Sequence, residues 1–215
     1  MKPFLEVIRQ QVLILDGAMG TMLQARGLRP GQSPEELNLT MPDVVASVHR
    51  EYVDAGADII VTNTFGGSRF KLSHYGLEDR LAEINARAVE IARQAAAGKA
   101  YVGASIGPTG QFVEPVGEIA FDDMKAAFRE QAEALIAAGA DLISLETFLD
   151  IKEIRAAVIA IREVSATIPV IAMLTFDDNG RSVLGTSPEA AAITLTAAGA
   201  DIVGSNCGMG VDGIH

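Results

Sequence analysis

Short apolar runs alternate along the chain with longer segments in which apolar residues recur every three or four positions. The short runs are almost continuously apolar, which is typical of parallel strands that are buried on both faces. They predict six strands, at Val12–Leu15, Ile59–Thr62, Tyr101–Ser105, Leu142–Glu146, Val170–Thr175 and Ile202–Asn206. The longer segments have helical periodicity and predict five helices, at about Pro42–Ala55, Asp79–Ala97, Asp122–Ala138, Ile151–Val164 and Pro188–Ala198.

The tetrapeptide Ala-Gly-Ala-Asp occurs three times, each time between a predicted helix and a predicted strand. A glycine at this point ends a helix in the left-handed conformation and allows a short turn into the strand. A short connection that is reused in this way indicates repeated strand–helix units. The three copies are Ala55–Asp58, Ala138–Asp141 and Ala198–Asp201.

Strict alternation of strands and helices leaves two architectures, an open doubly wound sheet and a closed (β/α)8 barrel. Nearly every predicted strand ends in a polar residue, and the long loops follow strands rather than precede them. In a barrel these strand ends converge on one mouth, where the active sites of this fold lie. We therefore predict an α/β fold of the (β/α)8 TIM-barrel type, with residues 1–215 forming a partial barrel domain of roughly the first six units. The polar strand ends are Asp16, Thr62, Ser105, Glu146, Thr175 and Asn206.

The composition excludes several classes of partner. A net charge of -11 argues against nucleic acid, whose phosphates are neutralised by Lys and Arg, and against an anionic membrane surface. No run approaches the roughly 20 apolar residues that a membrane helix needs, and no targeting segment is recognisable at the N-terminus. The single cysteine, Cys207, excludes an internal disulfide. Together these features predict a cytoplasmic protein in a reducing compartment.

Two acidic residues are candidates for ligand binding. Asp16 opens a glycine-containing loop, Asp16–Thr21, which is either a plain turn or a backbone cradle for a ligand; it lacks the lysine of a phosphate loop. Glu146 ends a buried strand, and a buried carboxylate must be paired or hydrogen-bonded. Either a structural hydrogen bond or the ammonium group of a ligand, shared with Asp16, would satisfy it.

The remaining candidates are weaker when taken singly. Thr62, Asn63 and Ser105 supply neutral donors and acceptors that suit a zwitterionic ligand, or they only cap strands. Cys207 is an inert packing residue, a nucleophile or one ligand of a metal site. As a nucleophile it lacks a convincing partner, because the three histidines, His49, His74 and His215, lie in a helix, in a distal loop and at the last position.

Seven segments spanning nearly the whole chain resemble, in order, the homocysteine S-methyltransferase family, and most closely its cobalamin-dependent branch. They are ILDGAMGTML (Ile14–Leu23), EELNLTMPDVV (Glu35–Val45), GADIIVTNTFGGSRFKL (Gly56–Leu72), GASIGPTGQFVEPVGE (Gly103–Glu118), DLISLETFLDIKE (Asp141–Glu153), LTFDDNGRSVLGTSPE (Leu174–Glu189) and GADIVGSNCGMG (Gly199–Gly210).

This resemblance implies a barrel that holds zinc in three cysteine thiolates, with the sulfur of homocysteine at the open fourth position. Cys207 matches the first of these ligands, whereas the adjacent pair of cysteines that forms the rest is absent from this sequence. Asp16 and Glu146 match positions that bind the amino group of the substrate. The resemblance and the loop positions together suggest further contacts to the carboxylate and sulfur ends of the substrate from the backbone amides of Gly17 and Ala18 and from Ser105 and Asn206. Thr62 and Asn63 are expected to bind the substrate as well.

The resemblance further implies methyl transfer to L-homocysteine to give methionine, with methylcobalamin as donor and with folate and cobalamin domains in the same parent chain. Members that use S-methylmethionine or betaine, and a non-catalytic amino-acid-binding or assembly module, are the alternatives. A phosphate-binding barrel lyase or isomerase is disfavoured, because no catalytic lysine ends a predicted strand. With one thiolate, the 215-residue chain is expected to hold no zinc tightly and to transfer no methyl group. The open sheet edges of a partial barrel favour pairing into a homodimer.

Overall fold

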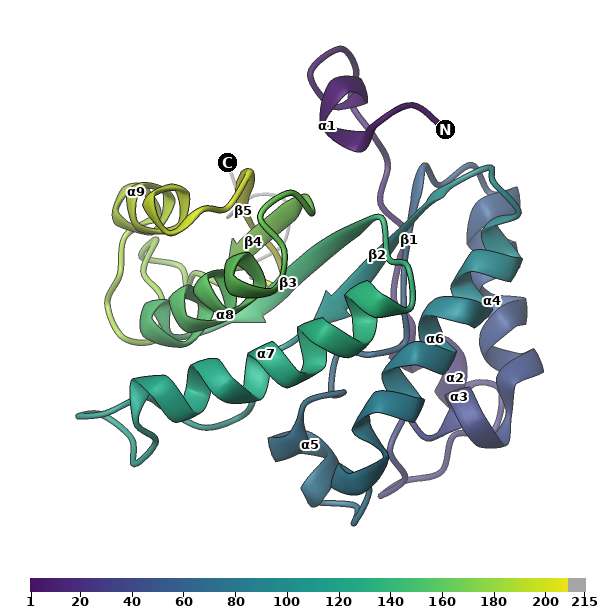
Figure 1. Ribbon diagram of the computed structural model, residues 1–215, viewed down its shortest axis with the longest axis horizontal. Coiled ribbons are helices and arrows are strands. Elements are labelled where there is room, and N and C mark those ends of the chain that lie inside the picture. Colours follow the sequence, from purple (N-terminus) through teal and green to yellow (C-terminus); the bar gives the residue numbers. More distant parts are fainter. Residues whose placement is uncertain (209–215) are drawn as a thin grey trace.

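The computed structural model describes residues 1–208, which form a five-stranded parallel sheet flanked by helices (Figure 1). The strands lie in sequence order, so each strand pairs with its neighbours along the chain. Consecutive order with parallel pairing is the arrangement of a partial (β/α)8 barrel, and it lacks the reversal of order that defines a doubly wound sheet. The strands are β1 (Ile59–Val61), β2 (Tyr101–Ile106), β3 (Leu142–Phe148), β4 (Val170–Leu174) and β5 (Ile202–Ser205).

The longer helices pack against one another in chain order along the outer face of the sheet (Figure 1). They are α4 (Pro42–Asp54), α6 (Leu81–Ala96), α7 (Phe121–Ala137), α8 (Ile151–Val164) and α9 (Pro188–Ala198). Four shorter helices were not predicted from the sequence pattern: α1 (Phe4–Val7), α2 (Gly20–Gln24), α3 (Leu37–Thr40) and α5 (Arg69–Ser73). The start of the helix predicted at about Asp79–Ala97 forms a separate 3-10 helix, η1 (Glu78–Arg80), directly before α6. No helix in residues 1–208 combines the length and the apolar character needed to cross a bilayer.

Alternate residues of the strands face two different environments. The outward residues, such as Ile60, Val102 and Ile143, join the helices in the main hydrophobic core. The inward residues at the starts of the strands form a second cluster with Phe4 of α1, whose ring meets that of Tyr101 edge-on at 5.4 Å. Helix α1 therefore covers the inner face at the end where the strands begin (Figure 1). Polar side chains such as those of Ser105 and Glu146 occupy the other end of that face.

The aspartates of the repeated tetrapeptide tie neighbouring strands together. Asp141 accepts a hydrogen bond from the amide of Val102 at 2.8 Å, and Asp201 accepts one from Val170 at 2.9 Å. In each case the aspartate precedes one strand and binds the start of the previous strand. The predicted left-handed glycines are confirmed, with φ values of 100° at Gly56, 92° at Gly139 and 113° at Gly199.

The prediction of a strand at Val12–Leu15 is wrong. Only Leu15 pairs, in a single parallel bridge to Ile59, while Val12 is 88% exposed and Ile14 62% exposed. The segment has a sheet neighbour on one side only, so its apolar side chains are not buried as those of the central strands are. The bridge nevertheless fixes the next residue, because the amide of Asp16 donates to the carbonyl of Ile59 at 2.9 Å.

Candidate functional site at the carboxyl ends of the strands

One cavity of about 560 Å³ gathers all nine residues that the sequence singled out. It opens at the carboxyl ends of the strands, on the inner face opposite α1. The nine residues are Asp16, Gly17, Ala18, Thr62, Asn63, Ser105, Glu146, Asn206 and Cys207. The lining also includes Leu15, Met19, Gly20, Thr21, Pro34, Glu35, Val61 and Phe65.

Asp16 enters the cavity with one satisfied and one unsatisfied carboxyl oxygen. Its Oδ2 accepts a hydrogen bond from the amide of Val61 at 2.9 Å, whereas its buried Oδ1 has no partner among residues 1–208. The pKa of Asp16 is raised to about 7, mainly by burial and to a smaller extent by the nearby charge of Glu146, while the hydrogen bond from Val61 opposes the shift. A cation in the cavity would stabilise the ionised form of this carboxyl group.

Glu146 faces the same cavity from the inner face of β3. Its Oε1 accepts a hydrogen bond from the hydroxyl of Ser105 at 2.6 Å. Burial raises the pKa of Glu146 above its ordinary value, and the hydrogen bond from Ser105 opposes this shift. The cavity therefore holds two carboxyl groups whose ionised forms are short of compensating charge.

Thr62 and Asn63 use their side chains to build the wall of the cavity. The Thr62 hydroxyl lies 2.6 Å from that of Thr64 and accepts a hydrogen bond from the amide of Ser105 at 3.2 Å. The amide group of Asn63 donates to the carbonyl of Pro34 at 2.7 Å and to Asn38 at 3.1 Å. These bonds tie the loop after β1 to β2 and α3.

Asn206 and Cys207 follow β5, and their side chains reach past β4 to contact Thr147 in β3. The side-chain amide of Asn206 forms hydrogen bonds with the amide and the hydroxyl of Thr147, at 2.7 and 2.9 Å. The exposed thiol of Cys207 lies 3.5 Å from the same hydroxyl. Sequence reasoning missed Thr147, and its position directly after Glu146 was the only signal that pointed to it.

Glu35 is a third carboxylate in the lining that the strand pattern did not reveal. It is buried and accepts hydrogen bonds from the amide of Gly66 at 2.7 Å and from the hydroxyl of Ser33 at 2.8 Å. Both bonds hold the loop after β1 against the segment that precedes α3. Phe65, at 39% exposure, supplies an aromatic wall that the sequence analysis also missed.

The described residues do not provide a complete metal site. No group of three His, Cys, Asp or Glu side chains in residues 1–208 is arranged to hold a metal ion, and Cys207 is the only cysteine of the chain. His49 is fully buried in α4, and His74 lies at the end of α5 beside a different cavity. The remaining histidine, His215, lies outside the described residues.

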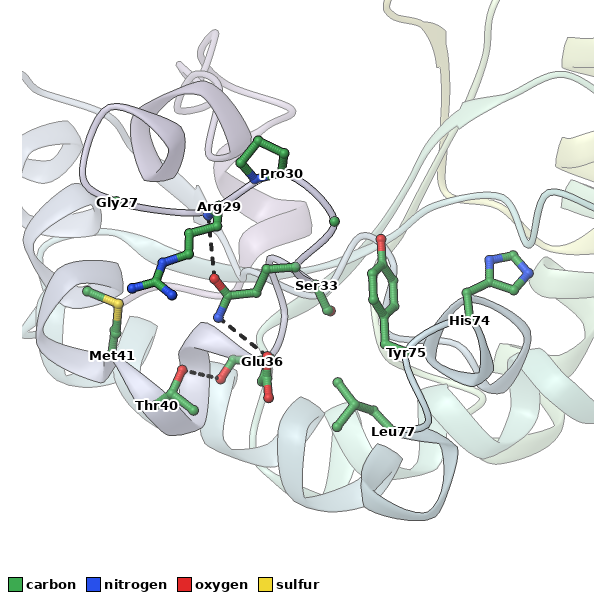
Figure 2. Close-up of a pocket in the computed structure, with 12 residues that line it drawn as sticks. Gly27, Arg29, Pro30, Ser33, Glu36, Thr40, Met41, His74, Tyr75 and Leu77 are labelled. Carbon is green, nitrogen blue, oxygen red and sulfur yellow. Dashed lines mark hydrogen bonds between the residues drawn. The ribbon is translucent and has the colours of Figure 1, made fainter.

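A second, larger hollow of about 760 Å³ lies between the loop that precedes α3 and the end of α5 (Figure 2). Within it the side chain of Gln32 donates a hydrogen bond to Glu36 at 3.4 Å and accepts one from the backbone amide of Arg29 at 3.5 Å. It contains none of the nine residues and no pair of carboxyl groups with raised pKa. The smaller cavity is therefore the candidate site.

Comparison with known proteins gives concordant matches. The family described as homocysteine S-methyltransferase matches residues 13–215. Methionine synthases of Mycobacterium tuberculosis and Mycobacterium leprae are 36% and 35% identical over 96% of the chain, which spans only 18% of the length of either protein. The metallated form of the homocysteine methyltransferase MmuM from Escherichia coli is 26% identical, with a TM-score of 0.83 over 96% of this chain and 78% of that one.

Proposed function

The chain belongs to the homocysteine S-methyltransferase family, and on this premise we propose that its cavity binds L-homocysteine for methyl transfer to the sulfur, which yields methionine. The observation that carries the proposal is the pair of carboxyl groups, Asp16 and Glu146, in one cavity. Both have a raised pKa, and one oxygen of Asp16 lacks a partner among the described residues. An α-ammonium group supplies the missing charge and three donors.

The carboxylate of the amino acid would bind the loop that follows Asp16. The amides of Gly17 and Ala18 donate no hydrogen bond to any other described residue, so they are free to receive an anion. The loop is held in place from behind, because the hydroxyl of Tyr52 on α4 donates to the carbonyl of Ala18 at 3.0 Å. A Cβ atom at Gly17 would lie 2.8 Å from that hydroxyl, so the loop can pack this closely against Tyr52 because residue 17 is a glycine.

The sulfur end of the substrate would face Cys207, which we propose as one zinc ligand. Zinc, when bound, lowers the pKa of a coordinated thiol, so that a thiolate is available near neutral pH. One thiol does not make a zinc site, so this part of the proposal requires ligands from outside the described residues. The metallated form of the related E. coli enzyme supports a metal in this family.

The donor of the methyl group would be methylcobalamin, presented with folate chemistry by further domains of a longer protein. The support is the likeness to methionine synthases, of which the chain matches 18% of the length. S-methylmethionine and betaine remain alternative donors. A non-catalytic amino-acid-binding module is a second candidate, and the observation that favours it is the single thiol in the described part of the site.

Isothermal titration calorimetry tests the amino-acid cradle without any need for a metal. L-Methionine should bind the chain, and N-acetyl-L-methionine, whose amino group carries no charge, should not. Glu146→Gln should weaken binding by roughly tenfold or more, as expected for the loss of a charged hydrogen bond. The exposed Glu189→Gln on α9 is the matched control and should bind as the wild type does. Equal affinity for both ligands would rule the cradle out.

Zinc content, measured by elemental analysis on the longest form of the protein that can be expressed, separates the two candidates. Stoichiometric zinc that is lost in Cys207→Ser supports the methyltransferase. Amino-acid binding without zinc and without methyl transfer to homocysteine supports the binding module.

A further inference from the structure

Two residues with left-handed backbone contact each other beside the cavity, where the hydroxyl of Thr147 lies 3.5 Å from the sulfur of Cys207. Thr147 has a φ of 65° and Cys207 a φ of 53°, and the only other non-glycine residue with positive φ in residues 1–208 is Ala97 at the end of α6. This conformation is unfavourable for a β-branched residue such as threonine. Strained backbone persists only where its surroundings hold it, and it clusters at functional sites.

The left-handed turn at Thr147 changes which way β3 presents its side chains. In a regular strand, residues two apart face the same side, so Glu146 and Phe148 would both face the cavity. The register between β3 and β4 instead shifts between Leu145 and Phe148. Phe148 consequently packs in the main core between the sheet and the helices, where its ring lies 5.7 Å from that of Phe128. The side chain of Glu146 still lines the cavity. The irregularity at Thr147 is what permits both placements.

Asn206 holds this turn from two strands away. Its Oδ1 accepts from the amide of Thr147 at 2.7 Å, and its Nδ2 donates to the Thr147 hydroxyl at 2.9 Å. Strands β3 and β5 are not neighbours, so both bonds pass over the end of β4. The end of β4 in turn supports Asn206, because the hydroxyl of Thr175 donates to its carbonyl at 3.0 Å.

The pair connects the two functional ends of the cavity. Thr147 directly follows Glu146, and Asn206 directly precedes Cys207. The Thr147 hydroxyl also donates to the sulfur of Cys207 at 3.5 Å, so a single hydroxyl contacts both residues that follow β5. Oδ1 and Nδ2 of Asn206 both bond to Thr147, and Nδ2 also lies 3.4 Å from the sulfur of Cys207, which gives this side chain a use other than direct substrate binding.

We infer that Thr147 and Asn206 are positioning residues, which fix the separation between the Glu146 carboxylate and the Cys207 sulfur. The inference rests on the proposed function, in which these two groups contact the amino end and the sulfur end of one substrate. A cavity that holds both ends at a set separation selects an amino acid by the length of its side chain.

Alkylation of the thiol provides the first test, since Cys207 is the only cysteine of the chain. Iodoacetamide is used at one fixed pH for every variant, so that differences in rate report the access and mobility of the thiol. Thr147→Val keeps the shape and removes the hydroxyl, and should react roughly fivefold faster, as expected for one lost hydrogen bond. Thr147→Ser should restore the slow rate, and Thr196→Val, on the exposed face of α9, should not change it.

Affinity for L-methionine in calorimetry is the second test. Thr147→Val should bind roughly fivefold more weakly and Thr147→Ser nearly as the wild type does. If the wild type binds no amino acid but the alkylation rates follow the expected order, the proposed function fails and the positioning role stands. If valine and serine variants react and bind alike, the positioning role is refuted. Should the valine variant not fold by circular dichroism, Thr147→Gly, which tolerates the left-handed turn, takes its place.

Discussion

The carboxyl groups of Asp16 and Glu146 reach one cavity from segments 130 residues apart, and the charge of Glu146 raises the pKa of Asp16. Neither carboxyl group has a basic side chain among the residues that line the cavity. The site is therefore built to hold negative charge without an internal counter-ion. On the proposed function, the ammonium group of the ligand would compensate this charge, and ligand binding and proton release would then be parts of one equilibrium.

Affinity for amino acids should consequently depend on pH. Below a pKa of about 7, Asp16 is mostly protonated, and a bound ammonium group must displace that proton. We expect the affinity for L-methionine to rise as the pH increases from 5.5 to 7.5 and to level off above that range. Calorimetry in buffers of different ionisation enthalpy would show the released proton. The Asp16→Asn variant should show a flatter profile, and a flat profile in the wild type would contradict the prediction.

The same carboxyl group should lower the stability of the free protein at neutral pH. Its pKa is about 7 in the folded state and 3.8 as the ordinary value, so the unfolded chain loses this proton first. Stability contributed by the protonated form is thus present below pH 3.8 and is lost as the pH rises through 7. Asp16→Asn should be more stable than the wild type by about 1–3 kcal/mol at pH 8, and the difference should shrink toward pH 4. Urea unfolding at both pH values measures it.

His49 should produce the opposite dependence. Its ring is fully buried without a hydrogen-bond partner in residues 1–208, and burial lowers its pKa from 6.5 to about 4. Between pH 6.5 and 4 the unfolded chain therefore binds a proton at His49 that the folded protein does not bind. The free energy of unfolding consequently falls as the pH drops through this range. His49→Leu should remove about 1–3 kcal/mol of that loss. The exposed His74→Gln should keep the wild-type dependence, and identical pH slopes for all three proteins would refute the assignment.

A methyl group at Gly67 should disrupt the loop that carries Thr62 and Asn63. A Cβ atom there would lie 2.6 Å from Oδ1 of Asn85, 2.8 Å from Nε2 of Gln131 and 3.0 Å from a backbone carbonyl. Since all three atoms belong to a buried hydrogen-bonded network, we expect Gly67→Ala to cost about 2–4 kcal/mol of unfolding free energy. Gly20→Ala, where nothing lies within 4 Å, is the control and should be neutral or slightly stabilising in thermal unfolding.

The central strands and long helices were predictable because buried residues in them follow local patterns of apolar and polar residues. Continuous apolar runs mark strands that are covered on both faces, and the left-handed glycines mark the turns into them. The same reasoning failed at Val12–Leu15, because an apolar run does not show how many sheet neighbours a strand has. Helices of four or five residues, such as α2 and α3, were not predicted because they are too short to display a helical period.

The candidate site was predictable as far as it consists of strand ends. All nine proposed residues line one cavity, whereas their individual roles remain predictions. Glu35 was missed because it reaches the cavity from a loop between two short helices, and the periodicity of apolar residues does not predict where such a loop lies. The contact between Thr147 and Asn206 depends on a backbone irregularity in β3, and residue types alone do not reveal a φ of 65°.

Because the strands lie in sequence order, the residues that line the cavity are synthesised in the same order in which their strands join the sheet. Asp16 precedes β1, the ends of β1, β2 and β3 supply Thr62, Ser105 and Glu146, and Cys207 follows β5, so a growing chain delivers these residues to the mouth one after another. The first carboxylate leaves the ribosome long before the second, and the thiol and its Asn206 neighbour come last of these. On the proposed function, a nascent chain would contact both ends of its ligand only after the fifth strand has docked, so that ligand binding would follow the completion of the sheet.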